Sequence, residues 1–423
     1  MDPHPLAPHP LAPPPVAPSP VGPPPGGLPA LVAPGPGLTD AELRRYARHL
    51  SVPEIGEVGQ RRLKNARVLC VGAGGLGSPA LLYLAAAGVG TLGIVDDDVV
   101  EVSNLQRQVL HGHTTVGAAK TASAAERIGD LNPLVGVVEH PQRLTAATAA
   151  GVLAGYDLVL DGTDNFAARY LVSDACALAG IPHVWGSILR FDGQYSVFWA
   201  AHGPTYRDLY PVAPAPGAVP SCAEAGVLGV LPGIVGTAMA VEAIKLITGI
   251  GTTMLGRVAT YDALSARWWE IPLAPTPGRP TVPAHTAHTA HAGADAGEDG
   301  PAGAVAGASA GEAPTVTARQ LAAMLAARGR GEADFELLDV REPYEARLAA
   351  IPGARLVPLG ELESGAGLAG LDPARPTVVH CKAGTRSETA LRLLTGHGHR
   401  DVTHLQGGIL AWIDQIDPDQ QPY

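Results

Sequence analysis

The chain has 423 residues, of which 46% are hydrophobic and only 16% are charged. This length allows two or three domains and excludes a small scaffold held together by disulfides. A net charge of −11 excludes a polyanion-binding surface as the main function, so we expect no nucleic-acid partner.

Proline is concentrated at the N-terminus, where residues 1–37 hold 15 of the 40 prolines. Such a segment adopts extended conformations and buries little apolar surface, so we predict a disordered tail; a ligand for proline-recognition domains is the alternative. The segment lacks the cationic and apolar regions of a secretory signal. Because the four cysteines are widely spaced and form no C-x-x-C pair, we expect a cytoplasmic protein.

Residues 38–273 form the first predicted domain, and their pattern is that of an α/β fold. After two amphipathic helices, apolar runs of strand length alternate with segments of helical periodicity. The predicted helices are 39–49, 55–64, 76–87 and 165–180, and the predicted strands are 67–72, 91–96 and 155–161. The first strand, helix and second strand form a βαβ unit, which indicates a Rossmann-like nucleotide-binding domain.

One apolar segment of this domain approaches the length of a membrane span. Ala225–Val241 is uncharged over 17 residues. Pro232 and several glycines interrupt it, and Glu224 and Glu242 flank it. We therefore expect a core or subunit-interface helix and no membrane partner.

A glycine-rich motif follows the first predicted strand. Gly72, Gly74 and Gly77 form the pattern G-x-G-x-x-G, with Gly75 inside it. Glycines at these places let backbone N–H groups approach phosphate at the positive end of a helix. Asp96 follows Gly74 by 22 residues, where a carboxylate can accept hydrogen bonds from ribose hydroxyls. The motif predicts a nucleotide site, and by itself it favours a dinucleotide-dependent oxidoreductase.

The residues after Asp96 favour ATP instead. Asn104, Arg107 and Lys120 supply polar and cationic groups of the kind that a triphosphate needs, because cations neutralise the charge of a transferring phosphate. Asp164 follows a predicted strand and supplies a carboxylate for Mg²⁺. We therefore expect ATP and Mg²⁺ at this site.

Over about Leu38–Ile271 the chain resembles the MoeB/ThiF-type adenylyltransferases, relatives of ubiquitin-activating enzymes. The segments that carry the resemblance are RYAR, GQRRLKNARVLCVGAGGLGSP, SNLQRQ, LNP, DGTDN, RYLVSDAC and VEAIKLITG, together with Asp96 and Lys120. The resemblance implies a nucleotide and metal site formed by Gly72, Gly74, Gly75, Gly77, Asp96, Ser103, Asn104, Leu105, Gln106, Arg107, Lys120, Asp164 and Asn165. It also implies a homodimer in which Arg48 and Arg107 reach the ATP of the other subunit.

The chain departs from this family at the zinc site. Family members carry two C-x-x-C pairs, but Thr205–Asp208 stands at the first position and no cysteine follows Trp268 in this domain. Thr205 and Asp208 leave too few ligands for a tetrahedral zinc ion. We therefore expect no zinc.

A compositionally biased segment separates this domain from the C-terminal part. Residues 274–314 are rich in Ala, Gly, Pro, Thr and His, which indicates a flexible linker. Residues 315–423 then predict a small α/β domain. Its predicted helices are 317–328 and one from about Ser387, and its predicted strands are 335–340 and 376–380.

Cys381 lies between the last of these strands and the helix. The N–H groups of such a loop can form an anion-binding nest, and Lys382 and Arg386 add positive charge, which favours a thiolate and then a persulfide anion. With Leu338–Tyr344 and Ile351–Ala354, this loop resembles a rhodanese domain. The resemblance implies a catalytic Cys381 and a persulfide loop of Lys382, Ala383, Gly384, Thr385 and Arg386.

The other three cysteines fall into two groups. Cys70 and Cys176 lie in apolar segments, and we expect both in the core. Cys222 lies in the sequence VPSCAEAG, where the adenylyltransferase family places a thiol that attacks the activated carrier or resolves an acyl disulfide. The residues with an implied catalytic role are therefore Cys381, Cys222, Arg107 and Asp164.

The two halves are chemically complementary, because an acyl-adenylate is an electrophile and a persulfide is a nucleophile. The chain resembles fusion proteins of the MoeZ type, which implies adenylation of a ubiquitin-like sulfur carrier with a Gly-Gly C-terminus and sulfur transfer to give a thiocarboxylate. The first expected carrier is the small subunit of molybdopterin synthase; carriers for thiamine, cysteine synthesis or tRNA thiolation are alternatives. The expected sulfur donor is thiosulfate or a cysteine desulfurase. An oxidoreductase and a catalytically inactive scaffold are the other two hypotheses.

Overall fold

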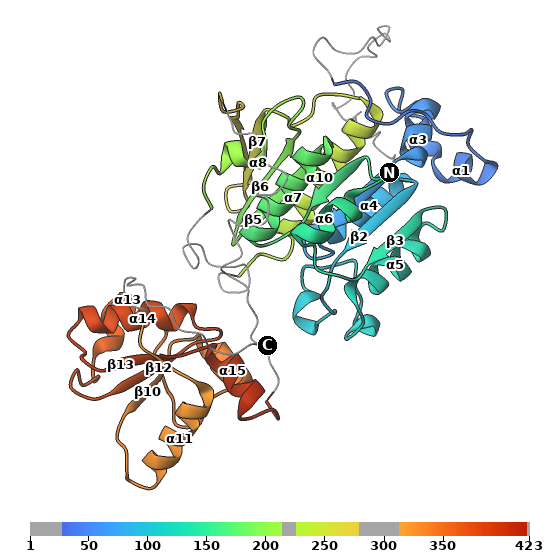
Figure 1. Cartoon of the computed structure of the whole chain (residues 1–423). Helices are drawn as coiled ribbons and strands as arrows, with labels where there is room; N and C mark the ends of the chain where they lie inside the picture. Colours follow the sequence, from blue (N-terminus) through green and yellow to red (C-terminus); the bar gives the residue numbers. More distant parts are fainter. Residues whose placement is uncertain (1–27, 214–225, 279–312, 421–423) are drawn as a thin grey trace, which may run out of the picture. The chain divides into compact units, whose positions relative to one another are not determined.

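The computed structural model describes residues 28–213, 226–278 and 313–420, which form two compact units (Figure 1). The first unit holds the described residues through Gly278, and the second holds those from Ala313 onward. Each unit has its own sheet and its own hydrophobic core.

The first unit is built on an eight-stranded sheet in the order β3-β2-β1-β4-β5-β6-β7-β8. Its strands are β1 (Arg67–Val71), β2 (Thr91–Val95), β3 (Gly136–His140), β4 (Leu158–Asp161), β5 (His183–Leu189), β6 (Asp192–Phe198), β7 (Arg257–Asp262) and β8 (Arg267–Pro272). The first five are parallel, and the last three continue the sheet in antiparallel pairs. Strand order reverses between β1 and β4, and sheets of this kind bind ligands at the carboxyl edge of that reversal.

Helices cover both faces of this sheet, because the central strands are apolar on both faces. One core contains α3 (Gly56–Asn65), α4 (Gly77–Ala87), α5 (Lys120–Leu131) and α10 (Leu231–Thr248). A second core, on the opposite face of β1, contains α6 (Ala146–Leu153) and α7 (Phe166–Ala179). Short elements complete the unit: α1 (Asp40–Arg45), α2 (Ala47–Leu50), η1 (Val102–Asn104), η2 (His113–Thr115) and α8 (Tyr206–Leu209). The predicted Rossmann-like α/β fold is confirmed.

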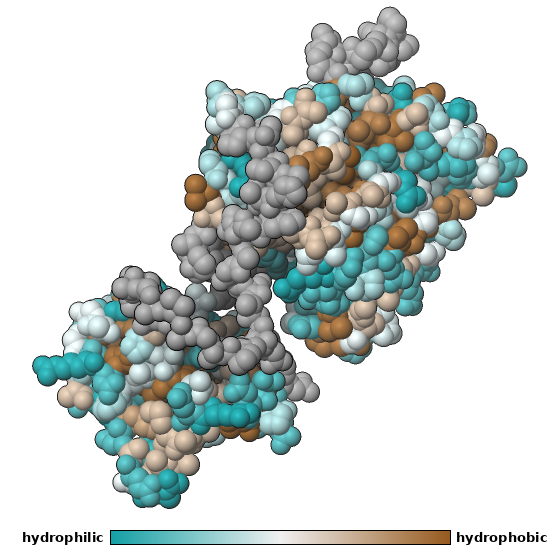
Figure 2. Space-filling model, viewed as in Figure 1, coloured by the Kyte–Doolittle hydropathy of each residue, from teal (hydrophilic) through white to brown (hydrophobic). Residues whose placement is uncertain are grey.

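The apolar segment that ends near Val241 contributes to α10. Among the described residues, α10 is the one helix long and apolar enough to cross a membrane by length and composition. However, 61% of it is buried inside the unit, and Val235, Met239 and Ala243 belong to the main core. On the visible face of the unit, hydrophobic residues occur in several small groups among hydrophilic ones (Figure 2). α10 is therefore a core helix of the first unit.

Residues 28–37 belong to the fold, which corrects the extent of the predicted disordered tail. Val32 is 5% exposed and lies in the core shared by α3 and α10. The N–H group of Leu31 donates a hydrogen bond to Leu246 O at 2.9 Å. Apolar residues between the last prolines thus supply the buried surface that orders this segment. The rest of the predicted tail, residues 1–27, lies outside the described residues.

The first predicted helix is interrupted at Tyr46. This residue has φ −98° and ψ 14°, and it separates α1 from α2. Its ring is buried, and its hydroxyl accepts a hydrogen bond from Asn132 Nδ2 at 2.9 Å. A tertiary contact therefore sets the break within the predicted helix.

The predicted linker is too long at both ends. In the first unit, the N–H group of Thr276 donates to an oxygen of Asp208 at 2.8 Å. In the second unit, Pro314 O accepts a hydrogen bond from the N–H group of His404 at 3.0 Å. Residues 279–312, the middle of the predicted linker, lie outside the described residues.

The second unit has a parallel five-stranded sheet in the order β11-β10-β12-β13-β9. Its strands are β9 (Thr315–Val316), β10 (Glu336–Asp339), β11 (Arg355–Leu356), β12 (Thr377–His380) and β13 (Val402–Leu405), and its helices are α11 (Ala318–Gly329), α12 (Pro343–Leu348), α13 (Leu359–Glu363), η3 (Ala366–Leu368), α14 (Thr385–Gly396) and α15 (Gly408–Gln415). α11 and α15 share one core, and α13 and α14 share another. The predicted small α/β fold is confirmed, and α14 begins two residues before the predicted Ser387.

Val32→Ala should lower the free energy of unfolding of the first unit by about 1–3 kcal/mol, because it removes two buried methyl groups and leaves a cavity. Val52, which is 40% exposed, offers the matched control, and Val52→Ala should change this free energy by less than about 0.5 kcal/mol. Urea denaturation followed by tryptophan fluorescence measures both variants, since four of the five tryptophans lie in this unit. Equal effects of the two substitutions would contradict the inclusion of residues 28–37 in the fold.

Candidate functional site

The glycine loop after β1 depends on contacts that only glycine allows. Gly72 has φ +93°, and a Cβ on Gly77 would lie 2.0 Å from the carbonyl oxygen of Gly72. This close approach lets α4 begin directly at Gly77. A Cβ on Gly74 would meet only Gln108 Nε2, at 3.7 Å. The loop is thus closed by backbone at Gly77 and open at Gly74, as close approach of a phosphate requires.

Asp96 and Lys120 lie beside this loop. The Asp96 carboxylate accepts hydrogen bonds from the N–H groups of Ala73, at 2.8 Å, and Asp98, at 3.0 Å. Lys120 Nζ is 4.0 Å from Asp96 and 2.7 Å from Asp98. Burial raises the pKa of the Asp96 carboxyl, although Lys120 and the two N–H groups act in the opposite direction. The Asp96 carboxylate, which can accept hydrogen bonds from hydroxyl groups, and the Lys120 cation therefore lie next to the glycine loop.

The segment Ser103–Arg107 also lies near the glycine loop. Arg107 Nη1 donates to Ser103 O at 3.0 Å, and Arg107 Cδ would lie 3.8 Å from a Cβ on Gly75. Asn104 is buried, and its Oδ1 accepts a hydrogen bond from the N–H group of Glu101 at 3.1 Å. Leu105 and Gln106 complete the turn. The structure thus brings the predicted arginine to the predicted loop.

The two carboxylates of the DGTDN segment lie in different surroundings. Asp161, at the end of β4, is buried: one carboxylate oxygen accepts hydrogen bonds from the Thr163 N–H and hydroxyl groups, and the other has no partner among the described residues. Burial raises its pKa. Asp164 is exposed, and Asn165 accepts a hydrogen bond from the N–H group of Ala168 as the N-cap of α7. Sequence reasoning missed Asp161, although it is the first acid of the same motif and directly ends a buried strand.

Arg48 is exposed on α2, and no hydrogen bond or ion pair within the described part of the chain joins it to the glycine loop.

Asp96, Asp97 and Asp98 form an acidic group whose oxygens lie within 4.8 Å of one another. Lys120 pairs with Asp98 and Arg143 with Asp97, at 3.2 Å, so cations already compensate this group. We therefore assign no metal to it.

His111 is a further residue that sequence reasoning missed. It is buried, with Nε2 2.9 Å from Ala73 O and Nδ1 2.9 Å from Ser123 Oγ. Burial lowers its pKa. The ring therefore ties the glycine loop to α5, which also carries Lys120.

Gly74→Ala should leave the stability of the first unit unchanged and weaken ATP binding by roughly tenfold, because its Cβ would occupy space that is free of protein atoms. Gly77→Ala should instead unfold or strongly destabilise the unit, because its Cβ would overlap the carbonyl oxygen of Gly72. Thermal unfolding and calorimetric titration with ATP separate the two effects. Unchanged ATP affinity in Gly74→Ala would contradict the assignment of this loop to phosphate.

The segment predicted to lack zinc forms a helix cap. The Asp208 carboxylate accepts hydrogen bonds from the Thr205 N–H, at 2.7 Å, and the Thr205 hydroxyl, at 3.1 Å, at the start of α8. Its second oxygen accepts the bond from the N–H group of Thr276 after β8. One carboxylate thus joins two segments that are far apart in sequence.

Cys222 lies outside the described residues, whereas Cys70 and Cys176 are buried in the core, as predicted.

In the second unit, Cys381 lies at the bottom of the loop between β12 and α14. It is 1% exposed, and its sulfur accepts a hydrogen bond from the N–H group of Gly384 at 3.1 Å. Gly384 has φ +119°, which favours glycine, and it precedes the first residue of α14. A Cβ on Gly408 would lie 2.5 Å from Cys381 O, so the start of α15 also packs closely on this loop. A backbone N–H group and the N-terminus of α14 therefore lie at the sulfur, an arrangement that stabilises an anion.

Arg386 is held by a buried carboxylate. Its two terminal nitrogens donate to the two oxygens of Glu345 at 2.6 and 2.8 Å, and Glu345 lies on α12. Burial raises the pKa of Glu345, but hydrogen bonds from Arg386 and the N–H group of Glu342 outweigh this and hold it below its usual value. Arg386 therefore contributes a fixed geometry to the loop, and its charge is already paired. The sequence pattern contained no signal for Glu345 as its partner.

His380 is fully buried directly before Cys381, and burial lowers its pKa to about 4, although Asp339 raises it. In the unfolded chain the ordinary value is near 6.5, so between these two pH values only the unfolded chain binds the proton. The free energy of unfolding of the second unit should therefore fall as the pH decreases from about 6.5 to 4, by at most about 1.4 kcal/mol per pH unit. Hydrogen exchange of β10 and β12 peptides at several pH values measures this slope.

His380→Asn should remove most of that slope. The matched control is His397→Asn, at an exposed histidine of the same unit, which should retain it. A wild-type stability that is independent of pH in this range would contradict a neutral buried His380.

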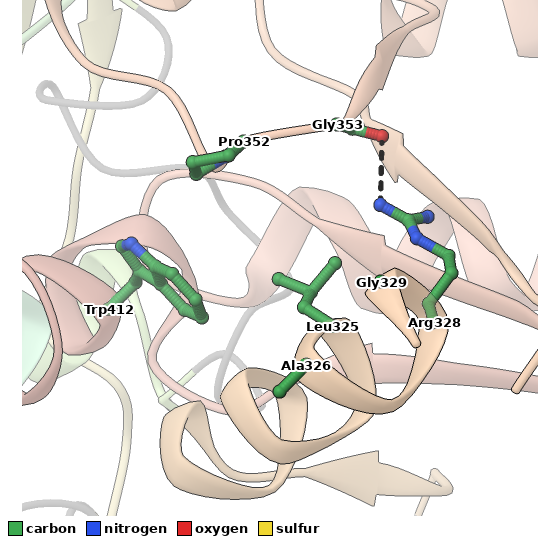
Figure 3. A pocket seen from close by; sticks show the side chains of 7 residues that line it. All are labelled: Leu325, Ala326, Arg328, Gly329, Pro352, Gly353 and Trp412. Carbon is green, nitrogen blue, oxygen red and sulfur yellow. Dashed lines mark hydrogen bonds between the residues drawn. The ribbon is translucent and has the colours of Figure 1, made fainter. Parts of the chain in front are cut away.

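A separate hollow of about 550 Å³ lies in the second unit (Figure 3). It is lined by Leu325, Ala326, Arg328, Gly329, Pro352, Gly353 and Trp412. Arg328 Nη2 donates to Gly353 O at 3.4 Å across it. None of the lining residues belongs to the Cys381 loop, so we do not include the hollow in the sulfur site.

Comparisons with known families agree with this division into two sites. The profile of the ThiF family matches residues 46–281, and that of the rhodanese-like domain matches residues 317–415. Both candidate sites fall inside these matches.

Several named proteins align with the chain. It is 50% identical over 400 residues to the probable adenylyltransferase/sulfurtransferase MoeZ of Mycobacterium tuberculosis, covering 94% of this chain and 99% of that protein. It is 39% identical over 419 residues to the adenylyltransferase and sulfurtransferase MOCS3 of Bos taurus, with coverage of 91% and 88%. The sulfur carrier protein adenylyltransferase of Thermus thermophilus is 52% identical over 247 residues, covering 57% of this chain and 91% of that protein.

Among solved structures, Escherichia coli MccB with ATP is similar to the first unit in fold. The TM-score is 0.51 at 19% identity, and the match covers 56% of this chain and 74% of that one. At this identity the likeness concerns the fold alone.

Proposed function

The chain belongs to the ThiF family and carries a C-terminal rhodanese-like domain, and from this premise we propose that it activates a ubiquitin-like sulfur carrier and then transfers sulfur to it. The proposal rests on one observation: the same chain holds two sites. The first unit has a glycine loop with Asp96 and Lys120 beside it, and the second has Cys381 in a loop whose Gly384 N–H group donates to the sulfur. Relatives that align over nine-tenths of the chain are named as adenylyltransferases and sulfurtransferases. This supports an enzyme with both activities.

The first half-reaction is adenylation, with ATP as the substrate. The C-terminal carboxylate of the carrier attacks the α-phosphorus of ATP, the bond to the β-phosphate breaks, and pyrophosphate leaves with the electron pair. Gly74 gives the phosphates room at the backbone, Asp96 accepts hydrogen bonds from the ribose, and Lys120 and Arg107 balance phosphate charge. The product is an acyl-adenylate.

Mg²⁺ fits this site through Asp164. This carboxylate is exposed after β4, and no ion pair joins it to another described residue, so its oxygens are available as hard ligands. A bound Mg²⁺ would neutralise phosphate charge. The role of Asn165 as a nucleotide contact stays a prediction, because its side chain serves as a helix cap.

The second half-reaction is sulfur transfer. A persulfide on Cys381 attacks the acyl carbon, AMP leaves, and an acyl disulfide forms between the carrier and the enzyme. A thiol then reduces this disulfide and releases the carrier thiocarboxylate. We propose Cys222 as the chain's own resolving thiol, and the residues between the two units as the linker that lets Cys381 reach the acyl-adenylate.

The partners follow from the same premise. We propose a carrier with a Gly-Gly C-terminus, first the small subunit of molybdopterin synthase, and thiosulfate or a cysteine desulfurase as sulfur donor. We also propose a cytoplasmic homodimer in which Arg48 acts on the ATP of the other subunit. Arg107, which the sequence also suggested for this role, lies beside the glycine loop of its own chain. Mixing Arg48→Ala chains with Lys120→Met chains tests that sharing. Adenylation should return in the mixture, because one site of a mixed dimer would then hold both wild-type residues, and no recovery would contradict the sharing.

We further propose that the enzyme works without zinc. The hydrogen bonds of Asp208 to Thr205 and Thr276 join the two segments at which the resemblance places metal ligands in other family members. Metal analysis of the purified chain should find no stoichiometric zinc.

ATP–pyrophosphate exchange with a panel of Gly-Gly carriers tests the adenylation claim. Exchange should require a carrier, and Lys120→Met should lower it by about 100-fold, because a cation next to the phosphates is lost. Lys245→Met, at a lysine on α10 away from this site, is the matched control and should retain exchange. Tight NAD binding without exchange would instead support an oxidoreductase, and full activity of Lys120→Met would support an inactive scaffold.

A further inference from the structure

A chain of buried hydrogen bonds begins at the sulfur of Cys381. The thiol donates to Ser387 Oγ at 3.5 Å, and Ser387 Oγ lies 3.3 Å from His404 Nδ1. Ser387 is fully buried, and His404 retains 8% of its surface exposed. These contacts connect the reacting sulfur, through a hydroxyl, to an imidazole at the edge of the core.

The fold itself brings the three residues together. β12 and β13 are parallel neighbours, and Val379 pairs with His404. Cys381 follows Val379 by two residues, so strand alternation places it on the same face of the sheet as His404. α14 packs over these two strands in the core that contains Cys381, and Ser387 lies in its first turn. The pairing of β12 with β13 and the position of the first turn of α14 therefore bring Cys381, Ser387 and His404 together.

Sulfur loading requires that the Cys381 thiol lose a proton. The thiol is 1% exposed, so bulk water has little access to it. The N–H group of Gly384 stabilises a charged sulfur but accepts no proton, and the nearby Glu345 carboxylate is engaged by Arg386. A base in contact with the sulfur, directly or through one hydroxyl, is needed.

We propose that Ser387 and His404 form the proton relay that generates the nucleophilic thiolate of Cys381. The thiol proton passes to Ser387 Oγ as the serine proton passes to His404 Nδ1. The thiolate attacks the outer sulfur of a sulfane donor such as thiosulfate, a new S–S bond forms, and sulfite leaves with the electron pair of the broken bond. The imidazolium returns its proton to solvent on its exposed side. This inference rests on the proposed sulfurtransferase function.

The two residues have different roles. Ser387 touches the reacting sulfur and is a catalytic residue, whereas His404 acts through it and is a positioning residue. The Ser387 hydroxyl now donates to Gly384 O at 2.8 Å, and rotation about its Cβ–Oγ bond redirects it to His404. For this, the neutral imidazole carries its hydrogen on Nε2.

The surroundings of His404 keep it neutral. Burial lowers its pKa; on α14, Glu388 raises it and Arg392 lowers it. On the strands beside it, Thr315 and Val316 of β9 are uncharged, and His380 of β12 points to the opposite face. At neutral pH the ring is therefore ready to accept a proton.

Single-turnover sulfite release from thiosulfate by the full chain, measured across pH, tests the relay. His404→Asn retains a hydrogen-bonding group near Ser387 but cannot take the proton, and it should slow release at pH 7 by about 10- to 100-fold and abolish the acid limb of the profile. Ser387→Ala should do the same, and the double variant should be no slower than either single variant. His399→Asn, at another buried histidine of this unit, is the matched control and should behave as wild type.

Wild-type rate and pH profile in His404→Asn, or additive losses in the double variant, would overturn the relay. Alkylation of Cys381 by iodoacetamide, followed by mass spectrometry of its peptide, gives a readout that needs no sulfur donor. The relay predicts that His404→Asn and Ser387→Ala both slow this alkylation at pH 7, and unchanged alkylation would also overturn it. If Cys381 of the wild-type chain is alkylated rapidly but the chain releases no sulfite from thiosulfate, the proposed sulfurtransferase function fails. The alkylation rates of the variants then still decide whether the relay exists.

Discussion

Both sites of this chain depend on parallel strands that end at one edge of a sheet and are followed directly by a tight loop and a helix. In the first unit, Val71 pairs with both Val95 and Asp161, so the loops after three strands leave the sheet at the same level. In the second unit, Asp339 pairs with His380, and Cys381 follows at once. Each loop is held by close backbone packing. A Cβ on Gly77 would lie 2.0 Å from Gly72 O, and a Cβ on Gly408 would lie 2.5 Å from Cys381 O, so neither position has room for a side chain.

One cation near each of these edges is already paired with a carboxylate. Lys120 binds Asp98, and Arg386 binds Glu345. An incoming phosphate must therefore compete with Asp98 for Lys120, so its binding exchanges one ion pair for another. At the sulfur site the buried pair fixes the loop, and the backbone of Gly384 is the donor that contacts the sulfur. Geometry, more than net charge, prepares both sites.

The sequence was sufficient to predict features that are encoded locally. The glycine loop, Asp96 and the Cys381 loop each follow an apolar strand at a spacing that backbone geometry requires, and both α/β folds were predicted from the same alternation. The partners set by tertiary contact were not predictable: Glu345 lies 41 residues from Arg386, and His111 lies 38 residues from Ala73. The burial of Asp161 and the inclusion of residues 28–37 in the fold were not predictable either, because burial depends on the neighbouring strands and helices.

We propose that sulfur moves from the second unit to a carrier activated by the first. The most direct measurement loads Cys381 with labelled sulfane sulfur, removes the donor, adds one Gly-Gly carrier, and follows the label by mass spectrometry of the carrier C-terminus. We predict that the label appears as a carrier thiocarboxylate only when ATP is present, and that neither Lys120→Met nor Cys381→Ala chains produce it. Label transfer to the carrier without ATP, or thiocarboxylate formation by the Cys381→Ala chain at the wild-type rate, would contradict the account.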